Sequence, residues 1–200
     1  MFKKIRRLIL LVLLLVIGFK AYEIRQDVKH VMTYEPLVVE VLTEMGSQAD
    51  PQLILAMIYT ETKGKTDDVM QSSESLTGTA NTITDSKSSI RQGVEVLAKH
   101  IAYAEELGLD QWTAVQAYNF GSSYIDYVKQ NGGQNLIKVA KAYSRDVVAP
   151  SLGNTTGQTY SYHHPVALLH GGELYVNGGN IYYSRQVRIN QYLMTIMTWF

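Results

Sequence analysis

The sequence feature that most constrains this chain is an uninterrupted apolar run, Leu8–Phe19, directly behind the basic cluster KKIRR. With Lys20 at the membrane surface, a helix over residues 5–24 reaches the roughly 20 residues that a spanning helix needs. No A-x-A-like cleavage site follows the run, which favours an uncleaved signal anchor over a cleaved signal peptide. Because basic flanks stay in the cytoplasm, we expect the rest of the chain on the extracytoplasmic side of the membrane.

The charged side chains are distributed unevenly along the chain. Residues 1–20 carry five positive side chains and no acid, whereas residues 21–200 carry 13 basic and 18 acidic side chains, a net charge of −5. An acidic body argues against nucleic acid as a partner, because binding to phosphates needs a cationic surface. The chain has no cysteine, which excludes disulfides, thiolate-bound metals and a thiol nucleophile.

Helical periodicity and helix-terminal signals predict an all-α body. Asp50-Pro51 and Asp110 are typical helix starts, and Ser89–Gln92 has the form of a capping box. The predicted helices cover residues 35–45, 51–64, 89–108, 110–118, 123–131, 136–147 and 185–199. Two long loops, residues 65–87 and 151–183, show no clear periodicity. The expected division is a basic stub with signal anchor over residues 1–24, a stalk over 25–34 and one domain over 35–200.

Glu61 is the candidate catalytic residue. It shares a helix face with the apolar Ile54 and Met57, so its carboxyl is expected at the edge of the core. It also lies in the last helical turn, where the helix dipole disfavours a negative charge. Both effects raise the pKa of a carboxyl, and cleavage of a glycosidic bond needs a carboxylic acid that is protonated near neutral pH. Position alone also allows an ordinary surface glutamate beside Lys63 and Lys65.

Four segments follow one another in an informative order: IYTETKGK, DVMQSSES, SSIRQGV and AYNFGSSYI. They resemble the lysozyme-like domain of Gram-positive cell-wall hydrolases of the CwlT type and the short, membrane-anchored pneumococcal type, which are related to goose lysozyme and soluble lytic transglycosylases. The resemblance covers roughly residues 35–195, and MQSSES between two helices is its most specific part. Thr62 stands where the family has Ser, and Val69 stands where it has Pro.

The resemblance implies a lysozyme-like fold and a set of site residues. Glu61 matches the catalytic acid. The loop that lines the cleft is matched by Met70, Gln71, Ser72, Ser73 and Glu74. The Tyr-Asn pair that contacts sugar is matched by Tyr118 and Asn119, and a tyrosine that helps to close the cleft is matched by Tyr182. The Gln71 amide suits an N-acetyl group or ring hydroxyls, and Tyr118 can stack on a sugar or hydrogen-bond Glu61. Core packing of Tyr118 and a helix C-terminal role for Asn119 are the structural alternatives.

Two further groups of polar residues bear on the mechanism. Asp67, Asp68 and Glu74 are candidates for a second carboxylate, although acids in a Ser/Thr-rich loop are more often simply solvated. The segment HHPVALLHGGE, with His163, His164, His170 and Glu173, contains metal-ligand residue types. Because Pro165 interrupts it and no HExxH is present, we expect no metal and no organic cofactor.

Together with the resemblance, these residues predict a peptidoglycan hydrolase at the surface of a Gram-positive type of cell, anchored by one helix. It would cleave the β-1,4 bond between N-acetylmuramic acid and N-acetylglucosamine, with Glu61 protonating the glycosidic oxygen. The carboxylate would then activate water, as in a muramidase, or the muramyl 6-hydroxyl, as in a lytic transglycosylase, which is the outcome we expect.

The expected partners are peptidoglycan glycan strands, the cytoplasmic membrane and cell-wall or division proteins. One alternative is a non-catalytic glycan-binding or scaffold protein of the cell-wall or division machinery. Another is a metal-dependent wall hydrolase that uses the histidines.

Overall fold

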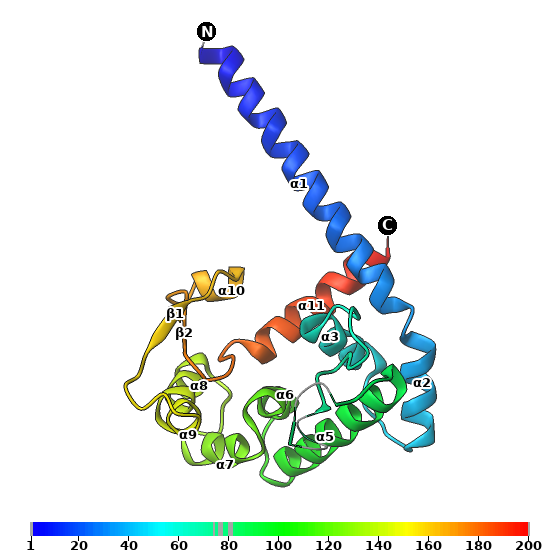
Figure 1. Ribbon diagram of the computed structural model, residues 1–200, viewed down its shortest axis with the longest axis vertical. Helices are drawn as coiled ribbons and strands as arrows, with labels where there is room; N and C mark the ends of the chain where they lie inside the picture. Colours follow the sequence, from blue (N-terminus) through cyan, green and yellow to red (C-terminus); the bar gives the residue numbers. More distant parts are fainter. Residues whose placement is uncertain (1, 74, 76–77, 80–81, 200) are drawn as a thin grey trace.

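The computed structural model describes residues 2–73, 75, 78–79 and 82–199 (Figure 1). Its helices are α1 (Phe2–Met32), α2 (Glu35–Glu44), α3 (Pro51–Glu61), α5 (Ser86–Glu106), α6 (Gln111–Phe120), α7 (Ser123–Gln130), α8 (Ile137–Tyr143), the π-helix η1 (Ser144–Val148), α9 (Ala149–Ser151), α10 (Pro165–Leu168) and α11 (Tyr183–Thr198). Strands β1 (Thr159–Ser161) and β2 (Glu173–Tyr175) form an antiparallel pair. The body is mainly helical, but the all-α prediction does not include this hairpin.

The N-terminal half of α1 projects away from the body, with its apolar run, Leu8–Phe19, exposed (Figure 1). The sequence predicts a membrane-spanning helix here. Within the described part of the chain, however, every helix is too short or too polar to cross a membrane. In α1 the apolar run ends at Phe19, and the charged Lys20 and Glu23 follow it closely.

The second half of α1 packs on the body. Residues 25–34 are expected from the sequence to form a stalk, yet Val28 and Val31 are completely buried. They lie three residues apart and therefore share the face of α1 that packs against α3 and α11. The base of α1 is thus part of the folded domain.

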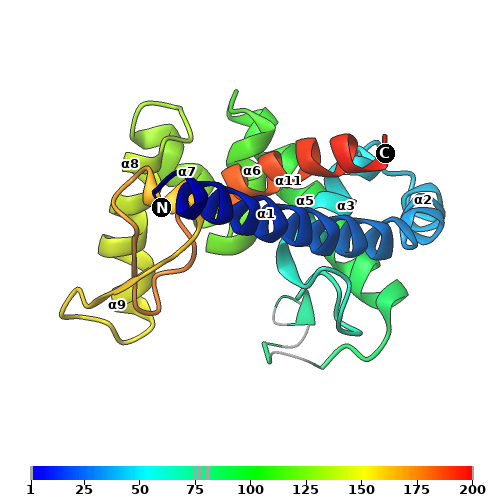
Figure 2. The same cartoon turned by 90° about the horizontal axis from the view of Figure 1, so that it is seen from above.

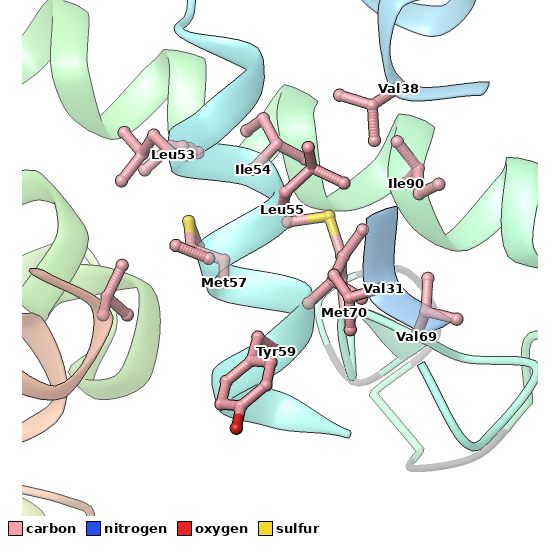
Figure 3. Packing of buried hydrophobic residues seen from close by; sticks show 14 of the residues in the cluster. Val31, Val38, Leu53, Ile54, Leu55, Met57, Tyr59, Val69, Met70 and Ile90 are labelled. Atoms are coloured by element: carbon pink, nitrogen blue, oxygen red, sulfur yellow. The ribbon is translucent and has the colours of Figure 1, made fainter. Parts of the chain in front are cut away.

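The first of two core clusters surrounds α3. All residues from Leu53 to Tyr59 are buried, because α3 is covered by α1, α2 and α11 and by the loop that follows it. Figure 3 shows Val31 of α1, Ile90 of α5 and Met70 of the loop converging on α3. This packing fixes the C-terminal end of α3.

The second cluster joins α6, α7 and α8 with the hairpin segment. Tyr124 and Tyr143 form its centre, with ring centroids 5.1 Å apart in an edge-to-face contact. Viewed from the side of α1, α11 runs across the body close to α1 and α6 (Figure 2). The α11 helix therefore contacts both halves of the domain.

Side-chain capping fixes the starts of α3, α5, α6 and α10. Asp50 accepts a hydrogen bond from Gln52 N at 2.9 Å, and Asp110 accepts one from Thr113 N at 2.9 Å, as the sequence predicts. The predicted capping box at Ser89 is wrong. The helix begins earlier, at Ser86, where Asp85 is the N-cap and accepts a hydrogen bond from Ser88 N at 2.8 Å. The Ser89 hydroxyl bonds to Asp68 instead.

The helix predicted over residues 136–147 is also not a single α-helix. It changes from the α-helix α8 to the π-helix η1 at Ser144 and continues through Pro150 into α9. Ser144 is completely buried, and its hydroxyl donates to Gly178 O at 2.7 Å. This bond ties the region to the segment that leads into α11.

Candidate active site

Glu61 is the last residue of α3 and is partly exposed. Burial raises the pKa of its carboxyl to about 7, from an ordinary value of 4.5. A nearby phenol, Tyr183, acts in the opposite direction, and the negative charge of Asp68 adds to the rise. The carboxyl is therefore shared between its protonated and ionised forms near neutral pH.

Two stacked tyrosines flank this carboxyl. The rings of Tyr118 and Tyr183 have centroids 6.3 Å apart and planes 10° apart. Tyr118 Oη donates to Met70 O at 3.0 Å, whereas Tyr183 Oη has no hydrogen-bond partner of ordinary geometry among the described residues. Burial, together with the charge of Glu61, raises the pKa of both phenols well above the usual range. Both hydroxyls therefore remain protonated donors.

Asp68 organises the loop that follows α3. It is buried, and its carboxylate accepts hydrogen bonds from Ser72 N at 2.9 Å, Ser73 Oγ at 2.6 Å and Ser89 Oγ at 2.7 Å. Burial alone would raise the pKa of Asp68, but these bonds outweigh it and hold the pKa below its ordinary value. Asp68 is thus an ionised structural centre and is not free to serve as a base.

Gln71 is an exposed residue of the same loop. Its backbone has a φ of +50°, in the left-handed region that few non-glycine residues adopt. Its Nε2 donates to Asp68 O at 3.2 Å. The Thr62 hydroxyl closes the other side of the loop by donating to Val69 O at 2.8 Å. These contacts hold the Gln71 amide at the surface of the loop.

Gly93 of α5 makes room for this arrangement. A Cβ at this position would lie 2.6 Å from Met70 Sδ and 2.9 Å from Tyr118 Oη. Any side chain would displace the loop or the tyrosine. The glycine therefore allows the hydrogen bond between Tyr118 and Met70.

The base of α1 holds the turn directly after Glu61. Lys63 and Lys65 each form an ion pair of 2.6 Å with Asp27 of α1. The carbonyl oxygen of Gly64 accepts hydrogen bonds from His30 Nε2 at 2.8 Å and Tyr34 Oη at 3.0 Å. The supposed stalk thus restrains the chain next to the candidate acid.

Several residues predicted to line a cleft are buried instead. The side chains of Met70, Ser72 and Ser73 face inward, where Met70 packs in the core and the serines bond to Asp68. They support the loop rather than offer side chains to a ligand. Glu74 lies outside the described residues. Asp67 is exposed.

The two residues of the predicted Tyr-Asn pair have different surroundings. Tyr118 is partly exposed beside Glu61, as described above. Asn119 is exposed, but its Oδ1 accepts a hydrogen bond from Asn180 N at 2.7 Å. Asn119 therefore fixes the segment that leads to Tyr183.

Tyr182, expected to help close the cleft, belongs to the second core cluster. Its ring is buried and its hydroxyl donates to His170 O at 3.2 Å. The next residue, Tyr183, faces Glu61 instead. A helix that begins at Tyr183 turns the two neighbouring side chains to different sides, and the prediction of a start at Arg185 could not show this.

The histidine segment does not come together as a metal site. His164 Nδ1 accepts from Val166 N at 3.3 Å and caps α10, while His163 and His170 are exposed. Within the described ranges, no three His, Asp or Glu side chains lie close enough to hold a metal ion. The histidines therefore offer no shared centre that could compete with Glu61.

The profile of the family described as Lysozyme-like matches residues 28–191. Pneumococcal vaccine antigen A of Streptococcus pneumoniae serotype 4 is 59% identical over 100% of this chain and 98% of its own length. The bifunctional muramidase/DL-endopeptidase CwlT of Bacillus subtilis is 44% identical over 46% of this chain and 27% of its own length.

A solved structure is similar as well. It is the crystal structure of a Staphylococcus aureus protein similar to a lipoprotein of the NLP/P60 family, with a TM-score of 0.72 and 30% identity. The match covers 82% of this chain and 52% of that protein. Its extent includes most of the folded body.

Proposed function

The chain belongs to the lysozyme-like family of cell-wall hydrolases, and from this premise we propose that it cleaves the glycan strands of peptidoglycan. The bond cut is the β-1,4 linkage between N-acetylmuramic acid and N-acetylglucosamine. The observation that carries the proposal is the Glu61 carboxyl, whose pKa burial raises to about 7. The similarity to the CwlT muramidase supports the same substrate class.

In this proposal, Glu61 is the general acid. Its proton passes to the glycosidic oxygen as the bond to the muramyl C1 breaks, which leaves a carboxylate. The Tyr183 phenol, which favours the ionised form of Glu61, stabilises that carboxylate. The carboxylate then takes a proton from the attacking hydroxyl, which restores the acid for the next cycle.

The candidates for a second carboxylate bear on the product. Of the three candidates, Glu74 lies outside the described residues. Among the described ones, Asp68 is occupied by its hydrogen bonds to serines, and Asp67 is an exposed loop residue. A retaining or inverting hydrolase normally places a second carboxylate within about 5–9 Å of the acid. We therefore favour attack by the muramyl 6-hydroxyl, which needs only one carboxyl and gives a 1,6-anhydro product. In this proposal the chain is a lytic transglycosylase.

Gln71 and Tyr118 are the proposed sugar contacts. Gln71 presents an amide at the surface of the loop that follows α3, and the partly exposed Tyr118 lies next to Glu61. An amide suits the N-acetyl group of the substrate, and a phenol ring suits the face of a sugar. Asn119 and Tyr182 are proposed to act indirectly, by holding the segment that leads to Tyr183.

We also propose that α1 attaches the protein to the cytoplasmic membrane with the body outside. Basic residues precede the apolar run, and the side chains of that run are exposed in the folded chain. Fractionation of cells tests this proposal. The full chain should remain with membranes after a high-salt wash, and recovery in the soluble fraction would contradict the attachment.

Turnover by the purified chain tests the proposed activity. Wild-type protein should release dye from labelled peptidoglycan, and Glu61→Gln should reduce the rate by at least ~10²-fold while leaving the circular dichroism unchanged. Binding without any release by the wild-type chain would favour a glycan-binding or scaffold protein. A misfolded Glu61→Gln variant would show instead that the residue is structural.

A further inference from the structure

One cavity of the body has a lining that does not include Glu61. It is a cavity of about 330 Å³ between the start of α6, the α10 segment and the first half of α11. Its lining includes Trp112, Leu169, His170, Arg185, Arg188 and Ile189. Neither Glu61 nor the two stacked tyrosines line it, so the proposed cleavage chemistry does not account for it.

Two guanidinium groups give the cavity its charge. Arg185 and Arg188 are three residues apart and therefore lie on one face of α11. Arg188 Cζ lies 5.3 Å from the ring centroid of Trp112. Among the described residues, no carboxylate lies within 4.0 Å of either arginine. Two unpaired guanidiniums beside an aromatic ring suit an anionic ligand that accepts several hydrogen bonds.

Asp110, the one acid among the described lining residues, does not neutralise this charge. Asp110 caps α6, where its Oδ1 accepts hydrogen bonds from Thr113 N at 2.9 Å and from Thr113 Oγ1 at 3.0 Å. With two arginines against one acid that is held by a helix N-terminus, the cavity keeps an excess of positive charge. Phosphate, like carboxylate, is a group that arginine binds through paired, charge-assisted hydrogen bonds.

The rim of the cavity is apolar and exposed. Leu169 is 82% exposed and its neighbour Leu168 is 65% exposed, while Ile189 is 48% exposed on the opposite side. The apolar stripe continues along α11 to Ile196 and Trp199. Exposed leucines and an aromatic ring beside unpaired cations are typical of a surface that meets lipid.

The position in the fold of the helices that carry this rim also supports contact with lipid. In Figure 1, α10 and the C-terminal end of α11 lie on the side of the body from which α1 projects. In Figure 2, viewed from that side, α11 is among the nearest elements of the body, close beside α1. The helices that carry the rim residues therefore lie on the same side of the body as the exposed apolar run of α1.

We propose that this cavity binds the phosphate headgroup of an anionic phospholipid, with Arg185 and Arg188 on the phosphate and the leucines in the interface. The proposal rests on the membrane attachment proposed above. It gives the body a second contact with the membrane, next to α1. Because the base of α1 also holds the turn after Glu61, two membrane contacts would fix the direction in which the catalytic site faces the wall.

Trp112 provides a reporter for the test. The chain has only two tryptophans, so in a Trp199→Phe background the fluorescence comes from Trp112 in the cavity. The full chain is held in neutral detergent micelles that contain either phosphatidylglycerol or phosphatidylcholine. We expect a saturable change in Trp112 fluorescence with phosphatidylglycerol and none with phosphatidylcholine. Equal responses to the two lipids would overturn the proposal.

Arg185→Gln is the decisive variant, because it leaves the contact between Arg188 and Trp112 in place. It should weaken the response to phosphatidylglycerol by at least ~10-fold, the scale of one charge-assisted hydrogen bond. Lys141→Gln removes one charge from an exposed position on α8 and should leave the response unchanged. Equal losses in the two variants would mean a general charge effect and would overturn the site.

Two further measurements separate the possible sources of failure. Glycerol phosphate in micelles without charged lipid should bind at least ~10-fold more weakly than phosphatidylglycerol, because it cannot use the apolar rim. Equal affinity would make a soluble phosphate the ligand and overturn the lipid assignment. Glu61→Gln should lose hydrolysis but keep the phosphatidylglycerol response, so failure of the lipid site and failure of the proposed catalysis are distinguishable.

Discussion

Tyr118 and Tyr183 stack with their ring planes 10° apart, yet their hydroxyls have different roles. Tyr118 donates to the backbone carbonyl of Met70 in the loop that follows α3, whereas Tyr183 faces Glu61 without an ordinary hydrogen-bond partner among the described residues. One phenol therefore fixes the loop, and the other is available to the carboxyl. The pair joins α6 and α11 beside the end of α3.

Tyr183→Phe is expected to raise the pKa of Glu61 further, because it removes a group that favours the ionised carboxyl. A general acid works only while protonated, so activity should fall as pH rises through about 7 in the wild type. In the variant this alkaline limb should move to higher pH. The pH profile of peptidoglycan cleavage measures the shift.

The matched control is Tyr118→Phe, which loses the bond to Met70 O but keeps the ring. It should lower activity through the loop and leave the alkaline limb where it is. An identical displacement of the limb in both variants would contradict the separate roles of the two phenols.

Glu61→Gln is expected to change how stability depends on pH. Folding raises the carboxyl pKa from 4.5 to about 7, so between these values the folded state holds a proton that the unfolded state releases. The free energy of unfolding of the wild type should therefore fall as pH rises through this range, by up to about 3 kcal/mol. Glutamine does not titrate, so the free energy of unfolding of the variant does not fall in this way.

Denaturant titrations at pH 4 and pH 8 measure the effect. The variant should match the wild type at pH 4 and exceed it at pH 8. A constant difference at the two pH values would show that the Glu61 carboxyl does not carry the raised pKa.

Asp68→Asn is expected to disrupt the loop. The amide replaces an accepting oxygen with a donor that faces hydroxyl and N–H groups already donating to it. We expect the free energy of unfolding to fall by about 2–4 kcal/mol and wall cleavage to fall with it. Asp67→Asn, at an exposed position next to it, should alter stability by less than about 0.5 kcal/mol.

The pH dependence gives a separate check on Asp68. Its pKa is lowered in the folded chain, so its contribution to stability is present above the ordinary value of 3.8 and is lost as pH falls through the lowered pKa. Asp68→Asn should therefore differ most from the wild type near neutral pH. A difference that stays the same down to the acid-unfolding range would contradict an ionised Asp68.

Local sequence signals predict those parts of the fold that depend on local chemistry. Asp50 and Asp110 cap their helices through their own neighbours two and three residues on, and both starts are confirmed. Ser89 also has a capping pattern, but a distant carboxylate, Asp68, takes its hydroxyl. A contact across 21 residues is not visible in a capping pattern, so the pattern places the start of α5 at Ser89 instead of Ser86.

The same limit applies to the candidate site. The sequence places Glu61 at the edge of an apolar helix face, and its surroundings in the fold raise its pKa as that position predicts. Which serines face inward, and which of Tyr182 and Tyr183 reaches the carboxyl, depend on tertiary contacts and on the phase of α11. The pattern of α1 shows Val28 and Val31 on one face, but only the fold shows that α3 covers it.

The central claim, that Glu61 is the acid that cleaves the glycan, is tested most directly by mass spectrometry of peptidoglycan digested with the purified full-length chain. We predict fragments that end in 1,6-anhydromuramic acid, lighter by one water than hydrolytic fragments, and none of them from a correctly folded Glu61→Gln variant. Fragments that end only in reducing muramic acid would keep Glu61 as the acid but make the enzyme a muramidase. Cleavage at a near wild-type rate by folded Glu61→Gln would contradict the account.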